Sequence, residues 1–170
     1  VISTPPVDDV VCDGQAASFS VTATGTSLTY QWQVDQGSGF VSIPEGGFYS
    51  GTASITLTID PASVAINGYD YRCVVTSYGL CPVNSASADL TVFSYPVITI
   101  QPADLTMCEF ADSMLTINAT GTTLTYQWQV DVAGTGTFTD IPDGGVYLGA
   151  QTDTLQILSP TGTMNGYDYR

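Results

Sequence analysis

Short runs along the chain alternate between apolar and polar residues, and this alternation predicts β-strands. In residues 18–24, Phe19, Val21 and Ala23 fall on one side, while serine and threonine fall on the other. The same period of two recurs in residues 30–34, 55–59, 69–76 and 88–92. A period of two with one apolar side is typical of antiparallel sheets that bury one face.

Turn-forming residues separate these runs. Glycine or asparagine stands at Gly25, at residues 37–39 and at Asn67, where tight turns are favoured. Between such turns, the alternation places Ile55 on the same apolar face as Leu57. No stretch has helical spacing, so many short strands joined by turns predict an all-β sandwich or barrel.

The sequence also repeats itself. The run YQWQVD at residues 30–35 returns unchanged at residues 126–131, an offset of 96. The run NGYDYR at residues 67–72 returns at residues 165–170, an offset of 98. Arrays of like modules usually serve as spacers or binding surfaces, so the repeat favours a structural or interaction protein.

The repeat predicts two domains, a first module over residues 1–96 and a second over residues 97–170. A module of this length has the commonest domain size. Val97–Ile100 is expected to form the first strand of the second module. Few residues separate Val92 from Val97, so we expect a short joint and an extended, semi-rigid rod.

The charge balance narrows the range of partners. The chain has 16 acidic residues, two arginines, no lysine and no histidine, and its net charge is −14. Binding to phosphate needs clustered basic residues, so nucleic acid and anionic membrane surfaces are poor partners. No apolar run is long enough to span a bilayer. The chain opens within the repeat pattern at Val1, so we interpret it as a piece of a longer precursor.

No catalytic arrangement is evident in the sequence. Without histidine, the chain cannot build a Ser–His–Asp or Cys–His site, and we predict that it is not an enzyme. No CxxC spacing suggests zinc, and no cofactor is expected. Calcium at a module junction is the alternative, with Asp8, Asp9 and Asp104 as candidate ligands, although aspartates in turns usually cap the backbone.

Several aromatic residues are not all needed for a core. They either pack at the edge of the core or form a platform that binds carbohydrate. These residues are Phe40, Phe48, Tyr49, Tyr78 and Tyr95.

The tryptophan and tyrosine positions resemble those of an immunoglobulin-like domain. The resemblance places Trp32 and Trp128 at the core tryptophan of strand C. It places Tyr71 and Tyr169 at the tyrosine corner of strand F, and Cys73 at the strand F cysteine. It implies tandem antiparallel β-sandwiches with Greek-key connections. The second module would be incomplete at its C-terminus, lacking the end of strand F and strand G.

Two sequence segments carry a narrower resemblance. TATGTxLTYQWQVD and NGYDYRCVVT look like tandem modules of very large secreted or cell-surface proteins of Bacteroidota. That family implies adhesins or gliding-associated proteins outside the cell. Its partners would be neighbouring immunoglobulin-like modules of the same protein or filament, with surface glycans or other cells. Ser113 and Thr154 fit the Asp-Ser/Thr-apolar pattern of O-glycosylation in that group.

The sequence departs from the immunoglobulin pattern at two places. Val21 and Ile117 stand where strand B usually carries a cysteine, so the usual disulfide between the sheets is absent. Gly14 of the first module is replaced by Phe110 in the second. We therefore expect a different turn into strand B there.

Four cysteines are candidates for disulfides: Cys12, Cys73, Cys81 and Cys108. Strand B would separate Cys12 from Cys81 of one module by ~25–30 Å, whereas a disulfide needs Cα atoms within about 7 Å. In a head-to-tail array, Cys12 could instead pair with the F–G cysteine of the second module. The alternative is a different pair within one module.

Three functions fit these observations. The first is a structural or adhesive repeat segment of a large exported bacterial protein. The second is a filament subunit in which a strand of another chain completes the second module. The third is a carbohydrate-binding accessory module.

Overall fold

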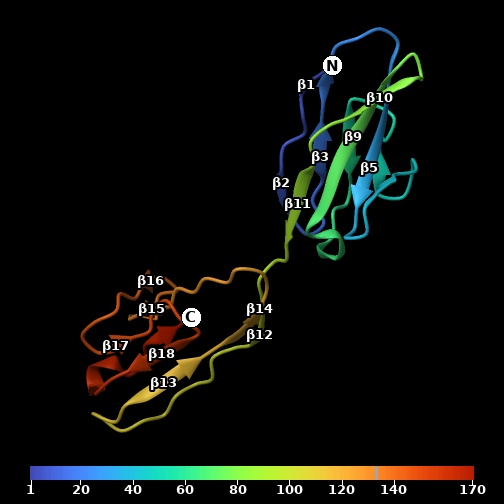
Figure 1. Cartoon of the computed structure of the whole chain (residues 1–170). Coiled ribbons are helices and arrows are strands. Elements are labelled where there is room, and N and C mark those ends of the chain that lie inside the picture. The colour runs from blue at the N-terminus through green and yellow to red at the C-terminus, as the bar shows by residue number, and fades with distance from the viewer. Residues whose placement is uncertain (133) are drawn as a thin grey trace. The chain divides into compact units, whose positions relative to one another are not determined.

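The computed structural model describes residues 1–132 and 134–170 (Figure 1). It divides into two compact units, Val1–Tyr95 and Pro96–Arg170. Their described residues form β-strands and two single-turn 3-10 helices, η1 (Val64–Ile66) and η2 (Gly162–Met164). The predicted all-β class is confirmed.

The first unit is a sandwich of two sheets. One sheet has the strand order β3-β8-β7. β1 and β4 form a separate pair, and β4 follows β3 in the sequence. The other has the order β2-β11-β9-β5-β6, and β10 also pairs with β9. Only the β2–β11 pair of this unit is parallel among the described strands. The strands are β1 (Ile2–Thr4), β2 (Asp9–Cys12), β3 (Ala17–Ser20), β4 (Thr22–Ala23), β5 (Leu28–Asp35), β6 (Phe40–Ser42), β7 (Tyr49–Ser50), β8 (Thr56–Ile59), β9 (Tyr69–Ser77), β10 (Cys81–Asn84) and β11 (Ala88–Phe93).

The second unit repeats three of these strand groups. Its sheets have the orders β13-β18-β17, β16-β15-β19 and β12-β14. They correspond to β3-β8-β7, β6-β5-β9 and β1-β4 of the first unit. The strands are β12 (Val97–Ile100), β13 (Ser113–Thr116), β14 (Asn118–Thr120), β15 (Gln129–Asp131), β16 (Thr139–Asp140), β17 (Tyr147–Leu148), β18 (Thr154–Ile157) and β19 (Asp168–Tyr169).

The alternation in the sequence matches burial in the strands, with one exception. Leu57 and Ile59 are fully buried, whereas Ile55 is 55% exposed. The prediction for Ile55 is wrong because the chain turns at residues 51–54 and β8 begins only at Thr56. The buried core of the first unit includes residues from both sheets: Phe19, Val21, Trp32, Leu57, Ile59, Tyr71, Cys73, Ala88, Leu90 and Val92.

The expected change of turn at Phe110 is also wrong. Gly14 has a φ of 81°, and Phe110 has a φ of 64°. The Gly14 N–H donates to the Ala62 carbonyl at 2.7 Å, and the Phe110 N–H donates to the Pro160 carbonyl at 2.8 Å. The second unit therefore keeps the left-handed turn and places there a phenylalanine that is 67% exposed, a conformation that costs a residue with a Cβ atom.

Candidate functional site

The tryptophans are held by the same contact in both units. Trp32 on β5 is fully buried, and its indole N–H donates to the Ser54 carbonyl at 3.0 Å. Trp128, directly before β15, is 2% exposed and donates to the Thr152 carbonyl at 3.0 Å. Both side chains therefore lie in the core, where a tryptophan satisfies its single donor by bonding to a nearby carbonyl.

The tyrosines of β9 and β19 join the two sheets of each unit. The Tyr71 hydroxyl lies 3.2 Å from the Tyr49 hydroxyl, and the Tyr169 hydroxyl lies 3.1 Å from the Tyr147 hydroxyl. In the immunoglobulin pattern the partner of this tyrosine is a backbone group; here it is a second tyrosine. Burial raises the pKa of both Tyr71 and Tyr169 far above its usual value, so both hydroxyls are protonated at neutral pH.

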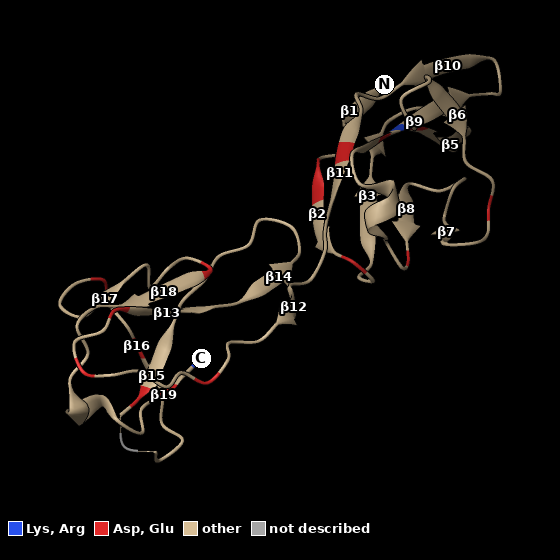
Figure 2. Ribbon diagram, turned by 90° about the horizontal axis from the view of Figure 1, so that it is seen from below, with Lys and Arg blue, Asp and Glu red and all other residues tan. Residues whose placement is uncertain are grey.

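The two arginines occupy equivalent positions. In the first unit the guanidinium of Arg72 lies 4.0 Å from the Phe40 ring centre, and its Nε donates to Gln33 Oε1 at 2.9 Å. Figure 2 shows basic colour on β9, among acidic positions spread over both units. We call Gln33, Phe40 and Arg72 together the cationic cluster. An equivalent cluster in the second unit consists of Gln129, Phe138 and Arg170, with distances of 4.0 and 2.8 Å.

The cationic cluster of each unit contains the single basic side chain of that unit, Arg72 or Arg170. The bond to glutamine uses one of the five N–H donors of a guanidinium, and the aromatic ring fixes its plane. The other four donors can serve a polar or anionic ligand. This arrangement suits binding, and it contains no nucleophile or general base.

The calcium candidates do not come together in the first unit. The Asp8 carboxylate accepts from the Asp89 N–H at 2.9 Å, and the Asp9 carboxylate accepts from the Val10 and Ser18 N–H groups at 2.9 Å. These bonds tie β2 to its neighbours. In the second unit, Asp104 lines a cleft. Among the described residues, no group of three or more His, Cys, Asp or Glu could hold a metal.

The four cysteines are free thiols in this structure. Cys73 is fully buried, and burial raises its pKa to about 11. Cys12 lies opposite Phe93, whereas Cys81 lies opposite Ser77 at the other end of β9. About ten residues of strand, or roughly 30 Å, separate these levels, so Cys12 and Cys81 of one unit do not pair. Cys108 is exposed.

The O-glycosylation candidates lie in two paired strands. Ser113 on β13 is opposite Ile157, and Thr154 on β18 is opposite Thr116. Both side chains are partly buried. The Thr154 hydroxyl also donates to the Asp153 carboxylate at 3.0 Å, so a glycan would replace an existing bond there.

The aromatic residues proposed as a carbohydrate platform are dispersed. Tyr49 belongs to the core through its bond to Tyr71. Phe40 lies opposite Asp35, whereas Tyr78 follows Ser77, which lies opposite Leu28 at the other end of the β5–β9 pair. Phe40 and Tyr78 therefore cannot contact one short glycan together. Phe48, Tyr78 and Tyr95 are 39%, 68% and 53% exposed.

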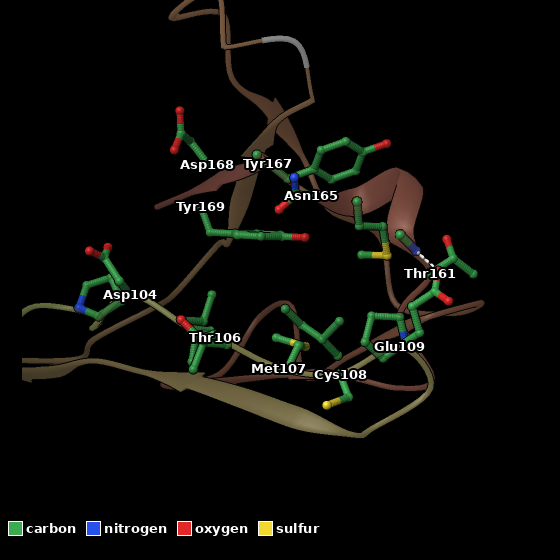
Figure 3. Close-up of a pocket in the computed structure, with 18 of the residues that line it drawn as sticks. Asp104, Thr106, Met107, Cys108, Glu109, Thr161, Asn165, Tyr167, Asp168 and Tyr169 are labelled. Carbon is green, nitrogen blue, oxygen red and sulfur yellow. Dashed lines mark hydrogen bonds between the residues drawn. The ribbon is translucent and has the colours of Figure 1, made fainter.

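The second unit contains a cleft of about 480 Å³ that the sequence did not reveal. Figure 3 shows Tyr167 and Tyr169 on one wall and Thr106, Met107 and Cys108 on the other. The walls come from segments about sixty residues apart, and no short motif links them. A comparison of these cleft residues with the corresponding residues of the first module is the sequence signal that could have located the cleft.

The similarity to a known sequence covers part of the chain. No protein-family model matches the chain. The chain is 36% identical over 107 residues to endoglucanase C of Cellulomonas fimi. The match spans 62% of this chain and 9% of that protein.

Solved structures resemble the whole chain. An I-band fragment of titin matches with a TM-score of 0.75 and 17% identity over 98% of this chain and 58% of that chain. Sidekick-1 immunoglobulin domains 1–5 match with a TM-score of 0.68 and 18% identity, covering 98% of this chain and 34% of that one. Extracellular domains 3–5 of Drosophila OTK match with a TM-score of 0.65 and 17% identity over 100% and 59%.

These similarities confirm the fold that the sequence predicted. The chain spans less than two thirds of each of these proteins, and at such low identity the structural likeness concerns architecture alone. No helix among the described residues is long and apolar enough to cross a membrane. The chain consists of immunoglobulin-like β-sandwich units in tandem.

Proposed function

We propose that this chain is a non-catalytic structural and adhesive repeat segment of a large exported bacterial protein, displayed at the cell surface or in an extracellular filament. The repeated core is the observation that carries the proposal. Both units rebuild the same tryptophan, tyrosine and arginine contacts with distances that agree within 0.1 Å. Duplication of a whole scaffold, rather than of one site, suits a spacer built from identical parts.

The resemblance to modules of Bacteroidota surface proteins supports the finer part of this proposal. Neighbouring modules of the same protein are the partners proposed first, with surface glycans or other cells as adhesion targets. In such a protein Ser113 and Thr154 are the proposed O-glycosylation positions.

Labelling of intact cells tests the proposal. Antibodies raised against this chain are applied to cells of the source bacterium, and the native polypeptide is sized by denaturing electrophoresis. Surface label together with a polypeptide many modules long supports a stalk or adhesin. Label only after the cells are permeabilised, or a polypeptide no longer than a single pair of modules, contradicts it.

A carbohydrate-binding accessory module is the second candidate, because the sequence match is to a protein named as an endoglucanase. The cationic cluster is the proposed site. A guanidinium held flat by an aromatic ring offers hydrogen-bond donors, and each unit carries one such cluster.

Binding to soluble and insoluble glucans separates the two candidates. If the clusters bind glucan, a double variant, Phe40→Ala with Phe138→Ala, should reduce retention at least tenfold. Phe48→Ala, which removes an exposed aromatic residue outside the cluster, is the matched control. Equal retention of all three proteins, or no retention of any, would leave the structural function in place and exclude this site.

A further inference from the structure

Arg72 has no carboxylate partner, although the chain is strongly acidic. The chain has 16 acidic residues and two arginines. Among the described residues, the side chain of Arg72 contacts Gln33 through Nε at 2.9 Å and the Phe40 ring at 4.0 Å, and it forms no ion pair. The two terminal nitrogens of its guanidinium are therefore available to a ligand. This edge of a guanidinium binds a carboxylate through two parallel hydrogen bonds.

A neutral residue orients the glutamine that holds Arg72. Gln33 Nε2 donates to Ser42 Oγ at 3.5 Å, so Gln33 turns its carbonyl oxygen towards Arg72. In the second unit Asp140 stands at the position of Ser42, and Gln129 Nε2 donates to Asp140 Oδ1 at 2.8 Å. A carboxylate at that position opposes the binding of an anion at the neighbouring guanidinium. The cationic cluster of the first unit is accordingly the one suited to an anionic ligand.

Arg72 lies beside a β-bulge. Between β10 and β11, residues 85–87 stand against two residues of β9, Arg72 and Cys73. The Ser85 N–H anchors the bulge by donating to the Cys73 carbonyl at 2.9 Å. The other two residues of the bulge are an alanine and a serine, both exposed. Bulges are over-represented next to active sites, and here the small side chains leave the guanidinium uncovered on this side.

Carboxylates lie on the same face of the sheet, close to Arg72. Asp70 and Arg72 flank the fully buried Tyr71, so their side chains leave β9 on the same side, about 7 Å apart along the strand. Asp35 and Asp89 lie directly opposite Asp70 on the two neighbouring strands. Like charges in such positions repel one another. A ligand that donates hydrogen bonds to this row would relieve the repulsion.

Asp70 is the member of this row whose carboxylate is available. Asp35 Oδ1 accepts from the N–H groups of residues 37–39, and Asp89 Oδ2 accepts from the Thr91 hydroxyl at 3.1 Å. Within the part of the chain that the structure describes, the Asp70 side chain makes no hydrogen bond. Its oxygens can accept from hydroxyl groups, whereas a second anion at this level would be repelled.

We propose that the outer face of β9 in the first unit binds glycans that carry a terminal or isolated uronic acid. Arg72 holds the carboxylate of the sugar, and Asp70 accepts hydroxyl groups from the same ring. Neutral glucans supply only the hydroxyl groups, and acidic polypeptides supply only the carboxylates. Acidic glycans would then be the surface glycans of the adhesive function proposed above, on which this assignment depends.

An NMR titration of the whole chain tests this site. The probe is a disaccharide of glucuronic acid and glucose. Cellobiose, which has a hydroxymethyl group in place of the carboxylate, is the matched neutral sugar. We expect saturable shifts of the amides of residues 31–34 and 70–74 and of the Arg72 Nε–H. The affinity should be at least about tenfold higher for the acidic sugar, because it alone forms hydrogen bonds between two charged groups.

Charge variants at the cluster separate a specific site from general electrostatics. Arg72→Gln should weaken binding of the acidic disaccharide by about tenfold. Ser42→Asp copies the residue that the second unit already carries and should weaken binding by about threefold. Ser50→Asp is the matched control, because it adds the same charge at an exposed position of β7 in the other sheet. It should leave the affinity unchanged.

Asp70→Ala gives the sharpest test, because two explanations predict opposite signs. Loss of a hydrogen-bond acceptor should weaken binding of the acidic disaccharide by about fivefold. At a site that attracts any anion, removal of this negative charge would strengthen binding instead. Tighter binding by Asp70→Ala therefore overturns the proposal.

Three further outcomes also overturn the proposal. Equal affinity for the two disaccharides would reject the acidic class and leave a carbohydrate site in place. Equally tight binding of a triglutamate peptide would assign the site to acidic polypeptides. Absence of saturable shifts at millimolar sugar would remove the site altogether. Labelling of intact cells reports on the adhesive segment separately, so failure of this site and failure of that function are distinguishable.

Discussion

The two units share their internal contacts and differ in how well those contacts are covered. Tyr71 and Tyr169 make the same hydroxyl contact to a tyrosine of the opposite sheet. Tyr71 is fully buried on β9, opposite Ala88 of the neighbouring strand β11, whereas Tyr169 is partly exposed and lines the cleft. The hydroxyl contact therefore forms in both units, although β11 pairs beside Tyr71 in the first unit alone among the described strands.

The glutamines before the tryptophans also make the same hydrogen bonds in both units. Gln31 donates through Nε2 to the Trp32 and Ile43 carbonyls at 2.9 and 3.0 Å. Gln127 donates to the Trp128 and Ile141 carbonyls at the same distances. This bridge does not involve β11, and it is unchanged between the units. Substitutions can therefore test this comparison in the core that the two units share, or at positions where the two units differ.

Removal of either core tryptophan should have the largest effect. Trp32→Ala and Trp128→Ala should each destabilise their own unit by about 3–5 kcal/mol, a large part of the stability of a small domain. Hydrogen exchange with mass spectrometry on the whole chain would report each unit separately. Loss of protection in the unit that was not mutated would show that the two units unfold as one.

Substituting the glycines of the β7–β8 and β17–β18 turns should have the next largest effect on stability. Gly51 and Gly149 have φ values of 73° and 81°, and a Cβ atom there would collide with the Thr56 or Thr154 carbonyl oxygen. Each substitution by alanine should cost about 1–3 kcal/mol in urea denaturation. Gly47→Ala is the control, since Gly47 has a φ of 66° but open space around its Cβ position. An equal cost for Gly47→Ala would mean that backbone conformation, and not the collision, sets the effect.

Phe110→Gly and Gly14→Phe exchange the residues of the turn at which the two units differ. These substitutions should change the stability of their units by smaller amounts, with opposite signs. Phe110→Gly relieves a left-handed conformation worth about 1–2 kcal/mol but adds backbone entropy worth about 0.5–1 kcal/mol to the unfolded chain. The second unit should gain the difference, and Gly14→Phe should cost the first unit a similar amount. Thermal denaturation of the two variants would check the signs. A loss of stability on Phe110→Gly would indicate that the exposed phenylalanine makes a stabilising contact.

Removing the Cys73 thiol should have the smallest effect at neutral pH, and its effect at alkaline pH should fall on the first unit, which contains this thiol. Burial raises the Cys73 pKa from 9.0 to about 11. Between these values the folded state binds more protons than the unfolded state, so stability falls as the pH rises from 9 to 11 and this contribution levels off above 11. Cys73→Val should make the fall in urea midpoint shallower. An unchanged slope would assign the alkaline loss to Tyr71 and Tyr49, whose pKa values are raised by burial as well.

The fold was predictable because strand alternation and the tryptophan position are local signals. Trp32 and Leu57 are buried as the alternation indicates, whereas Ile55 is exposed because a turn interrupts the strand before it. The partner of Tyr71 could not be predicted, since Tyr49 lies on another sheet and sequence spacing does not specify such a pair. The cationic cluster was hidden for the same reason, because Gln33, Phe40 and Arg72 meet only when three strands align.

The parallel pairing of β2 with β11 has a mechanical consequence for a unit that is pulled from its ends. A stretching force applied to the ends of the first unit pulls β2 towards the N-terminus and β11 towards the C-terminus. Because these strands run in the same direction across four residue pairs, the opposed pulls slide one along the other. All the hydrogen bonds between them then resist in shear at the same time, instead of opening one after another as in a hairpin pulled from its ends. The strand pair that closes the sandwich is therefore also the contact by which the first unit would resist tension.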